Sequence, residues 1–211
     1  MKRFLKSPDI PRGPNDPILL DLIYGWGNES WCARGEFLAD CINHAATSRG
    51  PILECGSGLS TLLIGAIAKK RNQKHFALEH QPPWAERVQK YLDRYRLESV
   101  TLCSTPLTDY GGFDWYDTRR TSMPASFNLV ICDGPPGDTR GGRYGLLPVM
   151  RDRLTPGCII LLDDAVREEE LAIARRWQHE VDATVERLGA GKLYIKVTVA
   201  GGAGRRVQLL A

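Results

Sequence analysis

The sequence predicts an α/β protein built around a doubly wound, mostly parallel sheet of seven strands that ends in an antiparallel hairpin. Three observations lead to this prediction. Short apolar runs alternate with amphipathic stretches from residue 50 onward, turn residues separate them, and only a few glycine-containing residues join the last two apolar runs. Alternation requires right-handed crossovers between parallel strands, whereas so short a connection can join only antiparallel strands.

Length and composition favour one domain. The chain has 211 residues, of which 43% are hydrophobic, enough for one substantial core. We expect an N-terminal arm and helix over residues 1–49, the main body over 50–200 and a loosely held tail over 201–211. The six cysteines lack C-x-x-C spacing and are expected to be reduced and buried.

Charge and hydropathy limit the partners that the chain is expected to have. Lys and Arg number 28 against 25 Asp and Glu, a formal net charge of +3, and the basic residues are scattered. Nucleic acid is therefore not an expected partner. No apolar run has the length of a signal peptide or a membrane span, which favours a cytoplasmic protein without a membrane partner. The pattern says nothing of the oligomeric state.

The N-terminal part is predicted to lie outside the sheet, as an arm and a helix that pack on it. Residues 1–27 are rich in Pro, Gly and Asn and predict an irregular arm. A helix is expected over 31–46, with Asn28 or Ser30 as its cap. The apolar face of this helix is expected to contain Trp31, Phe37, Leu38, Cys41 and Ile42.

The alternating part supplies the strands and helices of the body. Strands are expected at 52–55, 74–79, 99–103, 127–133 and 157–163, and the closing hairpin at 183–199. Helices are expected at 60–70, 83–95, 144–154 and 166–180. In such a sheet, ligands bind beyond the carboxyl ends of the strands, where the strand order reverses.

The stretch ILECGSGLST, residues 52–61, places a carboxylate and two glycines where the first strand gives way to a helix. Gly56 and Gly58 let a ligand lie on the main chain, and the helix offers free N–H groups to an anion. A nicotinamide dinucleotide would require a third glycine where Thr61 stands. S-adenosylmethionine fits better, because its carboxylate suits the helix N-terminus and its ammonium and sulfonium suit an acid such as Glu54.

The segment ECGSGLS resembles the first motif, acidic-x-Gly-x-Gly-x-Gly, of the class I S-adenosylmethionine-dependent methyltransferases, with Ser60 in place of the last glycine. The resemblance covers about residues 50–199, including the terminal hairpin, and implies a Rossmann-like fold. It implies that the cofactor-binding residues include Glu54, Gly56, Ser57 and Gly58. Glu79, at the end of the second strand, would bind the ribose hydroxyls.

The resemblance also suggests residues near the adenosine. His80 follows Glu79, although a surface histidine is the simpler interpretation of it. After the third strand, where the family often has an acid, this chain has Ser104 and Thr105.

Three carboxylates are expected at the ends of the fourth and fifth strands: Asp133 in CDGPPG, and Asp163 with Asp164 in LLDDA. Converging acids repel unless a cation neutralises them or one takes up a proton, and Mg²⁺ is a suitable cation. The arrangement looks like the catechol O-methyltransferase branch and its macrocin-type bacterial relatives, which implies a divalent metal on Asp133, Asp163 and Asp164. Against the metal, Asp164 can instead cap the next helix, and Pro135-Pro136 replace the polar residues usual in the metal-dependent relatives.

Segments between the strands offer residues for a substrate. In the loop 108–126, Trp115, Tyr116 and Arg119 can contact a planar or acidic substrate or simply anchor the loop. In 137–145, Arg140 and Arg143 can neutralise the nearby acids or bind an anionic substrate. Near the N-terminus, Trp26, Asn28 and Trp31 can cover the cofactor or pack as an ordinary arm.

The resemblance implies a methyltransferase that moves a methyl group from S-adenosylmethionine to a small molecule, at oxygen, with or without Mg²⁺. Asp133 and Asp163 are the expected catalytic residues, Asp133 is the candidate base, and Asp133 is also expected to contact the cofactor. Two alternatives remain open: a nicotinamide-dependent oxidoreductase, and a non-catalytic relative that binds adenosyl compounds.

Overall fold

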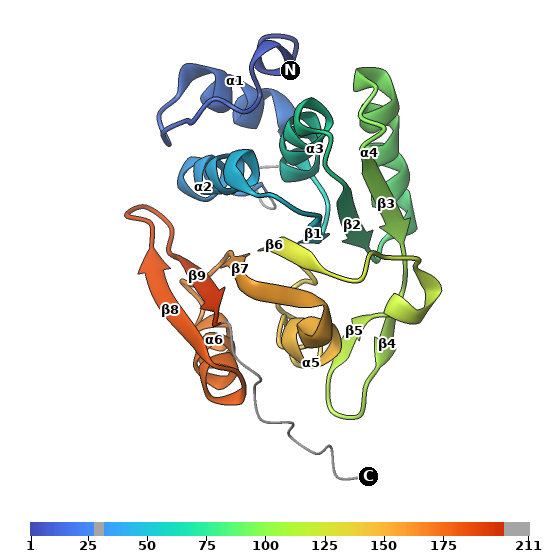
Figure 1. The fold of residues 1–211 in the computed structure, drawn as a ribbon, viewed down its shortest axis with the longest axis vertical. Coiled ribbons are helices and arrows are strands. Elements are labelled where there is room, and N and C mark those ends of the chain that lie inside the picture. The colour runs from blue at the N-terminus through green and yellow to red at the C-terminus, as the bar shows by residue number, and fades with distance from the viewer. Residues whose placement is uncertain (28–31, 201–211) are drawn as a thin grey trace.

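The computed structural model of the chain describes residues 1–27 and 32–200, and a seven-stranded sheet forms its centre (Figure 1). The strands follow the order β3-β2-β1-β6-β7-β9-β8. They are β1 (Ile52–Cys55), β2 (His75–Glu79), β3 (Val100–Ser104), β6 (Phe127–Cys132), β7 (Leu154–Leu162), β8 (Ala183–Leu188) and β9 (Tyr194–Val199). The first five are parallel, whereas β9 runs antiparallel to both β7 and β8. The predicted mostly parallel sheet with a closing hairpin is confirmed.

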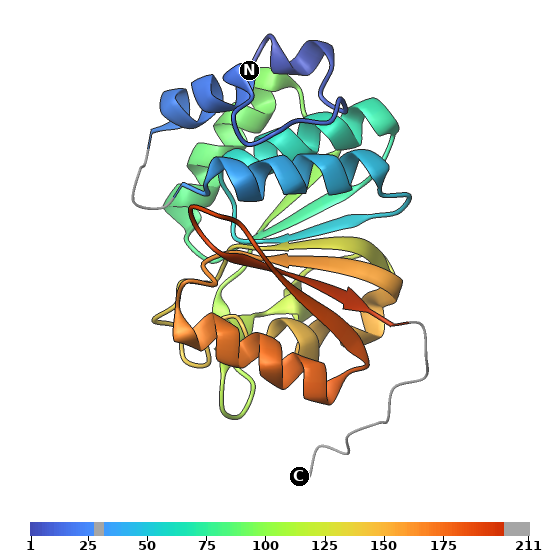
Figure 2. The same cartoon turned by 90° about the vertical axis from the view of Figure 1, so that its left-hand side faces the viewer.

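Helices cover both faces of this sheet, as the edge-on view of Figure 2 shows. One face carries α2 (Gly35–Thr47), α3 (Leu59–Arg71) and α4 (Pro82–Tyr95), and α1 (Pro17–Trp26) packs on α2 and α3, on their side away from the sheet. The other face carries α5 (Leu146–Met150) and α6 (Glu168–Glu180). The sheet is therefore the middle layer of three.

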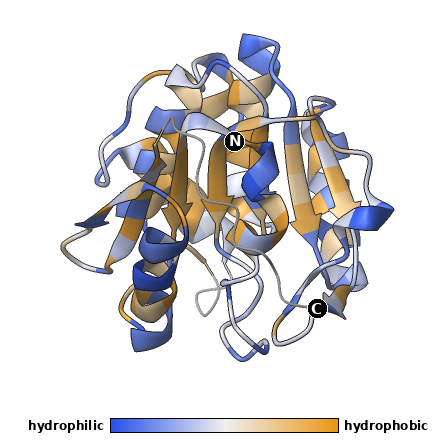
Figure 3. Ribbon diagram, turned by 60° about the horizontal axis from the view of Figure 1, so that its bottom comes forward, coloured by the Kyte–Doolittle hydropathy of each residue, from blue (hydrophilic) through white to orange (hydrophobic). Residues whose placement is uncertain are grey.

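Alternate residues of the central strands lie in two separate hydrophobic cores, one on each face of the sheet. Ile52 of β1 and Ile131 of β6 lie in the core under α2 and α3, while Leu53 and Val130 lie in the core under α5 and α6. All four are fully buried. Burial on both faces explains why these strands are continuous apolar runs in the sequence, and Figure 3 shows the central strands mostly orange, with blue on the outer helices and loops.

The N-terminal arm is more regular than the sequence prediction. Residues 1–27 contain a short 3₁₀ helix, η1 (Phe4–Lys6), as well as α1. Asp16 caps α1 through its side chain, which accepts hydrogen bonds from the N–H groups of Ile18 (2.9 Å) and Leu19 (3.0 Å), and Pro17 follows in the first turn. The prediction of an irregular arm was wrong, because it rested on the Pro, Gly and Asn content of the segment, whereas Asp16 and Pro17 start a helix.

The next helix also begins later than predicted. α2 starts at Gly35 and not at residue 31. Asn28, Ser30 and Trp31, the predicted cap residues and first apolar residue, lie outside the described part of the chain, as does the predicted tail over 201–211.

Two segments beyond β3 differ from their predicted structure. The segment after Ser104 forms a small hairpin, β4 (Leu107–Asp109) with β5 (Asp114–Tyr116), followed by η2 (Thr118–Arg120). The helix predicted over 144–154 is shorter, because α5 gives way to η3 (Arg151–Arg153) and residue 154 already belongs to β7. Within residues 1–27 and 32–200, no helix combines the length and apolar character needed to cross a bilayer.

Candidate active site

A cavity of about 370 Å³ opens beyond the carboxyl ends of the strands, where the order reverses between β1 and β6. This size lies within the range of small-molecule sites, and the position is the usual one for a ligand in an open α/β sheet. Its lining residues come from segments spread along the chain: Trp26, Cys32 and Ala33; Gly56 to Ser60; Glu79 to Gln81 and Trp84; Tyr116; Asp133 to Gly137; Arg143; Asp163, Asp164 and Arg167; and Lys192.

The glycine turn after β1 forms one wall of the cavity. Gly56 has φ +89°, and a Cβ on it would lie 3.2 Å from the backbone nitrogen of Gly134. Gly58 is extended at φ 175°, and nothing lies within 4 Å of where its Cβ would be. Thr61, where a dinucleotide motif has its third glycine, accepts a hydrogen bond from the Gly58 N–H through Oγ1 at 2.8 Å. Gly56 is thus required by backbone conformation and close packing, whereas Gly58 leaves the cavity wall open.

Glu79 at the end of β2 organises this turn. Its Oε2 accepts hydrogen bonds from the Ser57 N–H (3.2 Å) and the Ser57 hydroxyl (2.7 Å), and its Oε1 accepts one from the Gln81 N–H (2.9 Å). Burial alone would raise the pKa of Glu79, but hydrogen bonds from His80, Gln81 and Ser57 outweigh it and lower the pKa below its usual value. The side chain is an ionised acceptor at the cavity wall, where the sequence predicted it.

Two neighbours of Glu79 were named with it in the sequence. His80 lines the cavity, with Nδ1 3.3 Å from Glu79 Oε1 and its ring edge-on to Tyr116 at 6.3 Å. Ser104 is the register partner of Glu79 on β3 and is exposed, but it does not line the cavity. The structure therefore brings His80 to the site and leaves Ser104 beside it.

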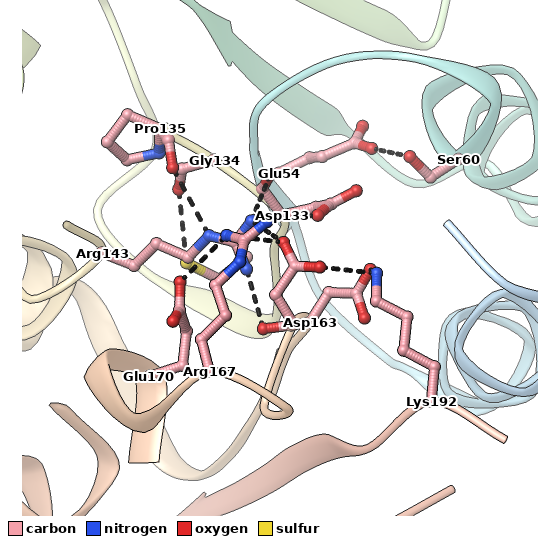
Figure 4. A network of polar contacts seen from close by, with 12 residues as sticks. Glu54, Ser60, Asp133, Gly134, Pro135, Arg143, Asp163, Arg167, Glu170 and Lys192 are labelled. Carbon is pink, nitrogen blue, oxygen red and sulfur yellow. Dashed lines mark hydrogen bonds and ion pairs between the residues drawn. The ribbon is translucent and has the colours of Figure 1, made fainter. Parts of the chain in front are cut away.

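Glu54 lies beneath the turn and not in the cavity. It is 1% exposed, because at this position β1 still pairs with both β2 and β6. Its Oε1 accepts a hydrogen bond from Ser60 at 2.5 Å (Figure 4). Its Oε2 lies 3.0 Å from His75 Nε2. The expected contact of Glu54 with a cofactor has no support in the lining of the cavity; the carboxylate fixes the first turn of α3 instead.

The three predicted carboxylates do meet. One oxygen from each of Asp133, Asp163 and Asp164 lies within 4.8 Å of the others, and we call these residues the acidic cluster. Asp164 has φ +61°, so the chain turns there and adjacent side chains can face the same point. The alternative role of Asp164 as a helix cap is not observed, since α6 begins at Glu168 after Arg167, and no side chain caps it.

Arg143 neutralises the acidic cluster from one side (Figure 4). Its guanidinium lies 2.7 Å from Asp164 Oδ2 and 3.2 Å from Asp133 Oδ1, and it donates to the backbone carbonyls of Asp163 (2.7 Å) and Asp133 (2.9 Å). The side chain is 2% exposed. Burial would lower the pKa of Arg143, but the neighbouring carboxylates raise it, so the guanidinium stays charged. Arg140 instead pairs with Asp109 and Asp114 at the β4–β5 hairpin.

Lys192 and Arg167 complete the neutralisation, and the sequence analysis missed both. Lys192 Nζ lies 2.8 Å from Asp163 Oδ2 and 2.6 Å from Asp164 Oδ1, and Arg167 lies 3.1 Å from Asp164 Oδ2. A signal for Lys192 existed: β9 pairs antiparallel with β7, so the start of β9 returns to the end of β7. The residues present do not fit a divalent ion, because protein cations already contact all three carboxylates.

Asp133 is the acid of the cluster most open to the cavity. Its side chain keeps 24% of its surface exposed, against 1% for Asp163 and 12% for Asp164. Burial and the neighbouring Asp163 carboxylate raise the pKa of Asp133 to about 8. A carboxyl group with such a pKa can exchange a proton near neutral pH.

The segment 108–126, in which the sequence suggested substrate contacts, contributes one residue to the cavity lining. Tyr116 lines the cavity, whereas Trp115 is fully buried in the core and Arg119 is exposed and paired with Asp117. At the other wall, Trp84 donates a hydrogen bond to the Ser57 carbonyl at 2.7 Å and contacts Trp26 edge-on. Trp84 and Gln81 were also missed by the sequence analysis, although both follow Glu79 closely.

Several solved structures with a similar fold are methyltransferases. The SAH-bound methyltransferase of Podospora anserina is 15% identical, covers 94% of each chain and has a TM-score of 0.64. The O-methyltransferase of Bacillus cereus in complex with SAH is 15% identical over 88% of this chain and 92% of that one, with a TM-score of 0.59. A methyltransferase from Pyrococcus furiosus is 20% identical over 78% and 83%, with a TM-score of 0.54. At these identities the likeness shows the fold.

The family follows from the sequence itself. A search of the curated proteins finds no match to the chain. A family model described as a methyltransferase domain matches residues 53–165, which is more than half of the chain and spans the glycine turn, Glu79 and the acidic cluster. The chain therefore belongs to this methyltransferase domain family, with the fold of the class I S-adenosylmethionine-dependent enzymes.

Proposed function

We propose that this protein transfers the methyl group of S-adenosylmethionine to a hydroxyl oxygen of a small molecule bound over the acidic cluster. The observation that carries this proposal is the placement of Glu79, the glycine turn and Asp133 around one cavity. The named O-methyltransferase activity of the Bacillus cereus structure supports the choice of oxygen.

Three features of the cavity suit the cofactor. The bare wall at Gly58, where no atom lies within 4 Å of an added Cβ, leaves room for a ligand against the main chain. The first turn of α3 presents N–H groups that lack intrahelical acceptors and so favour a carboxylate. Glu79 is ionised, and a carboxylate has acceptor capacity beyond its bonds to Ser57 and Gln81, which suits the ribose hydroxyls. When bound, the cofactor supplies an electrophilic methyl group on a sulfonium.

Asp133 is the residue for proton transfer in this proposal. A hydroxyl that gains a methyl group must lose its proton, and Asp133 is the cluster acid most exposed to the cavity. Arg143 fixes its carboxylate through Oδ1, which leaves Oδ2 without a partner among the described residues. Asp163 and Asp164 form ion pairs with Lys192 and so hold its ammonium group near Asp133.

Calorimetric titration of the purified protein with S-adenosylmethionine, S-adenosylhomocysteine and NAD tests the cofactor assignment. Binding of both adenosyl compounds, without binding of NAD, is the expected result. Acceptors are then found by screening hydroxylated aromatic compounds and sugars for release of S-adenosylhomocysteine. Binding of NAD alone, or no binding of an adenosyl compound, would contradict the proposal.

A further inference from the structure

The acidic cluster has the composition of a site for a divalent ion. Asp133, Asp163 and Asp164 are oxygen ligands of the kind that Mg²⁺ prefers, and one oxygen from each lies within 4.8 Å of the others. A metal on such a site needs those oxygens free and a nearly octahedral shell around it. Whether the oxygens are free therefore decides whether the cluster can serve a metal.

Protein cations already contact most of these oxygens. Lys192 faces Asp163 Oδ2 and Asp164 Oδ1, while Arg143 faces Asp133 Oδ1 and Asp164 Oδ2. Arg167 adds a second cation to Asp164 Oδ2. Among the described residues, only Asp133 Oδ2 and the buried Asp163 Oδ1 have no partner, so the cluster offers a metal two free oxygens.

Lys192 is placed at the cluster by the fold and is not a free surface lysine. Its side chain is 22% exposed. The turn before it is fixed by Glu36 at the start of α2, whose carboxylate accepts hydrogen bonds from the N–H groups of Ala190 (2.9 Å) and Gly191 (3.0 Å). After it, the Tyr194 hydroxyl donates to Asp40 of α2 at 2.7 Å. Contacts on both sides of Lys192 thus bind the hairpin to α2.

Charge balance favours the ammonium over a metal at this position. Arg143, Arg167 and Lys192 face the three carboxylates of the cluster, and Arg167 also pairs with Glu170 at 3.4 Å, so a divalent ion would have to compete with protein cations at each aspartate. The ion would also have to displace an ammonium that two carboxylates stabilise at short distance. An ammonium has three N–H donors, and those facing Asp163 and Asp164 leave one for a group in the cavity.

We infer that Lys192, supported by Arg143, takes the place of a divalent cation at the acidic cluster, and that its remaining N–H binds the acceptor oxygen. The inference rests on the proposed function for its chemistry. In the transfer, the acceptor oxygen forms a bond to the methyl carbon while the carbon–sulfur bond breaks and its electron pair stays on sulfur. The hydroxyl proton passes to Asp133, and Lys192 stabilises the developing negative charge on oxygen.

A metal titration tests the first half without any acceptor. Mn²⁺ binding is measured by electron paramagnetic resonance on the wild-type protein, Lys192→Met and Lys196→Met. Lys196 is the matched control, because it also lies on the β8–β9 hairpin, is also 22% exposed and pairs with Glu186, away from the cluster. Wild type and Lys196→Met are expected not to bind Mn²⁺, whereas Lys192→Met gains a site. Lys192→Gln repeats the test with a neutral polar side chain in case the first variant does not fold.

Two results of the metal titration would overturn the inference. One is stoichiometric Mn²⁺ binding by the wild type that Asp164→Asn abolishes, and the other is no gain of Mn²⁺ binding in either Lys192 variant.

Kinetics with an acceptor from the screen test the second half of the inference. Lys192→Met should lower kcat on the order of 100-fold and leave the affinity for S-adenosylhomocysteine within about threefold, because the inference places Lys192 on the acceptor and not on the cofactor. Unchanged kcat would remove Lys192 from the reaction. Failure of adenosyl compounds to bind the wild type would instead count against the proposed function, since the Mn²⁺ results do not depend on them.

Discussion

The glycine turn after β1 and the acidic cluster after β6 and β7 line the same cavity, yet they are built differently. The turn is made by residues 54–61 and by Glu79 with its sequence neighbours, mostly through backbone groups. The cluster joins four segments of the chain through side-chain charges, with Arg143, Arg167 and Lys192 around the carboxylates. The glycine turn therefore depends on local conformation, whereas the acidic cluster depends on long-range charge pairing.

The largest effect is expected from breaking that charge pairing at its buried centre. Arg143→Met removes a guanidinium that is 2% exposed and leaves Asp133 and Asp164 without it. Removing one partner of a buried ion pair costs about 3–5 kcal/mol of unfolding free energy. Denaturant unfolding measures the loss, and Arg140→Met, in a half-exposed ion pair at the β4–β5 hairpin, should change little. Equal stability of the two variants would show that the cluster does not depend on Arg143.

Beside the glycine turn, Glu79→Ala should weaken binding of S-adenosylhomocysteine about 10- to 100-fold, because the proposed function places one or two hydrogen bonds from the ribose on this charged group. The variant also loses the bonds that position Ser57. Calorimetry measures the affinity, and thermal unfolding confirms that the variant folds. Glu98→Ala is the control, since Glu98 is exposed and pairs with Lys69 far from the cavity. Unchanged affinity in Glu79→Ala would show that Glu79 does not bind the ribose hydroxyls.

The pH dependence of transfer should sharpen the description of the acidic cluster. If Asp133, with its pKa of about 8, accepts the proton, then kcat/KM rises as the pH increases through about 8 and levels off above it, because the base form is the carboxylate. Asp163→Asn removes a neighbouring negative charge that raises this pKa, so the midpoint should move to lower pH. Asp133→Asn should abolish transfer at every pH while cofactor affinity stays nearly intact. An unmoved midpoint in Asp163→Asn would assign the titration to another group.

The smallest effects are expected from alanine substitutions of Gly56 and Gly58, which should change stability and cofactor binding differently. Gly56→Ala places a side chain at φ +89° and 3.2 Å from the Gly134 backbone, so we expect a loss of about 1–3 kcal/mol in stability. Gly58→Ala adds a methyl group in open space and should leave stability nearly unchanged, but the methyl group enters the cavity and should weaken cofactor binding. Unfolding and calorimetry on both variants test the pair. The reverse pattern would mean that the cofactor does not lie on the Gly58 wall.

Local signals in the sequence were sufficient for the strands and for part of the site. Alternating apolar runs located the seven strands, and the carboxyl ends of β2 and β6 brought Glu79 and Asp133 to the cavity as expected. Glu54 was expected at the cavity but is buried beneath the turn, because a position near a strand end does not tell on which side of the turn the side chain lies. The helix α1 was also missed, although its Asp16-Pro17 start is a helix signal as well as a turn signal.

Periodicity and the backbone preferences of neighbouring residues were enough to predict the layered sheet, the glycine turn and the acids at the strand ends. The groups that neutralise Asp133, Asp163 and Asp164 could be identified only from the folded chain. Lys192 is 29 residues from Asp163 in sequence and reaches it because β9 pairs with β7 and α2 fixes the hairpin. A carboxylate cluster can be balanced by a metal, a proton or a protein cation, and the choice depends on which charges the folded chain brings within contact distance.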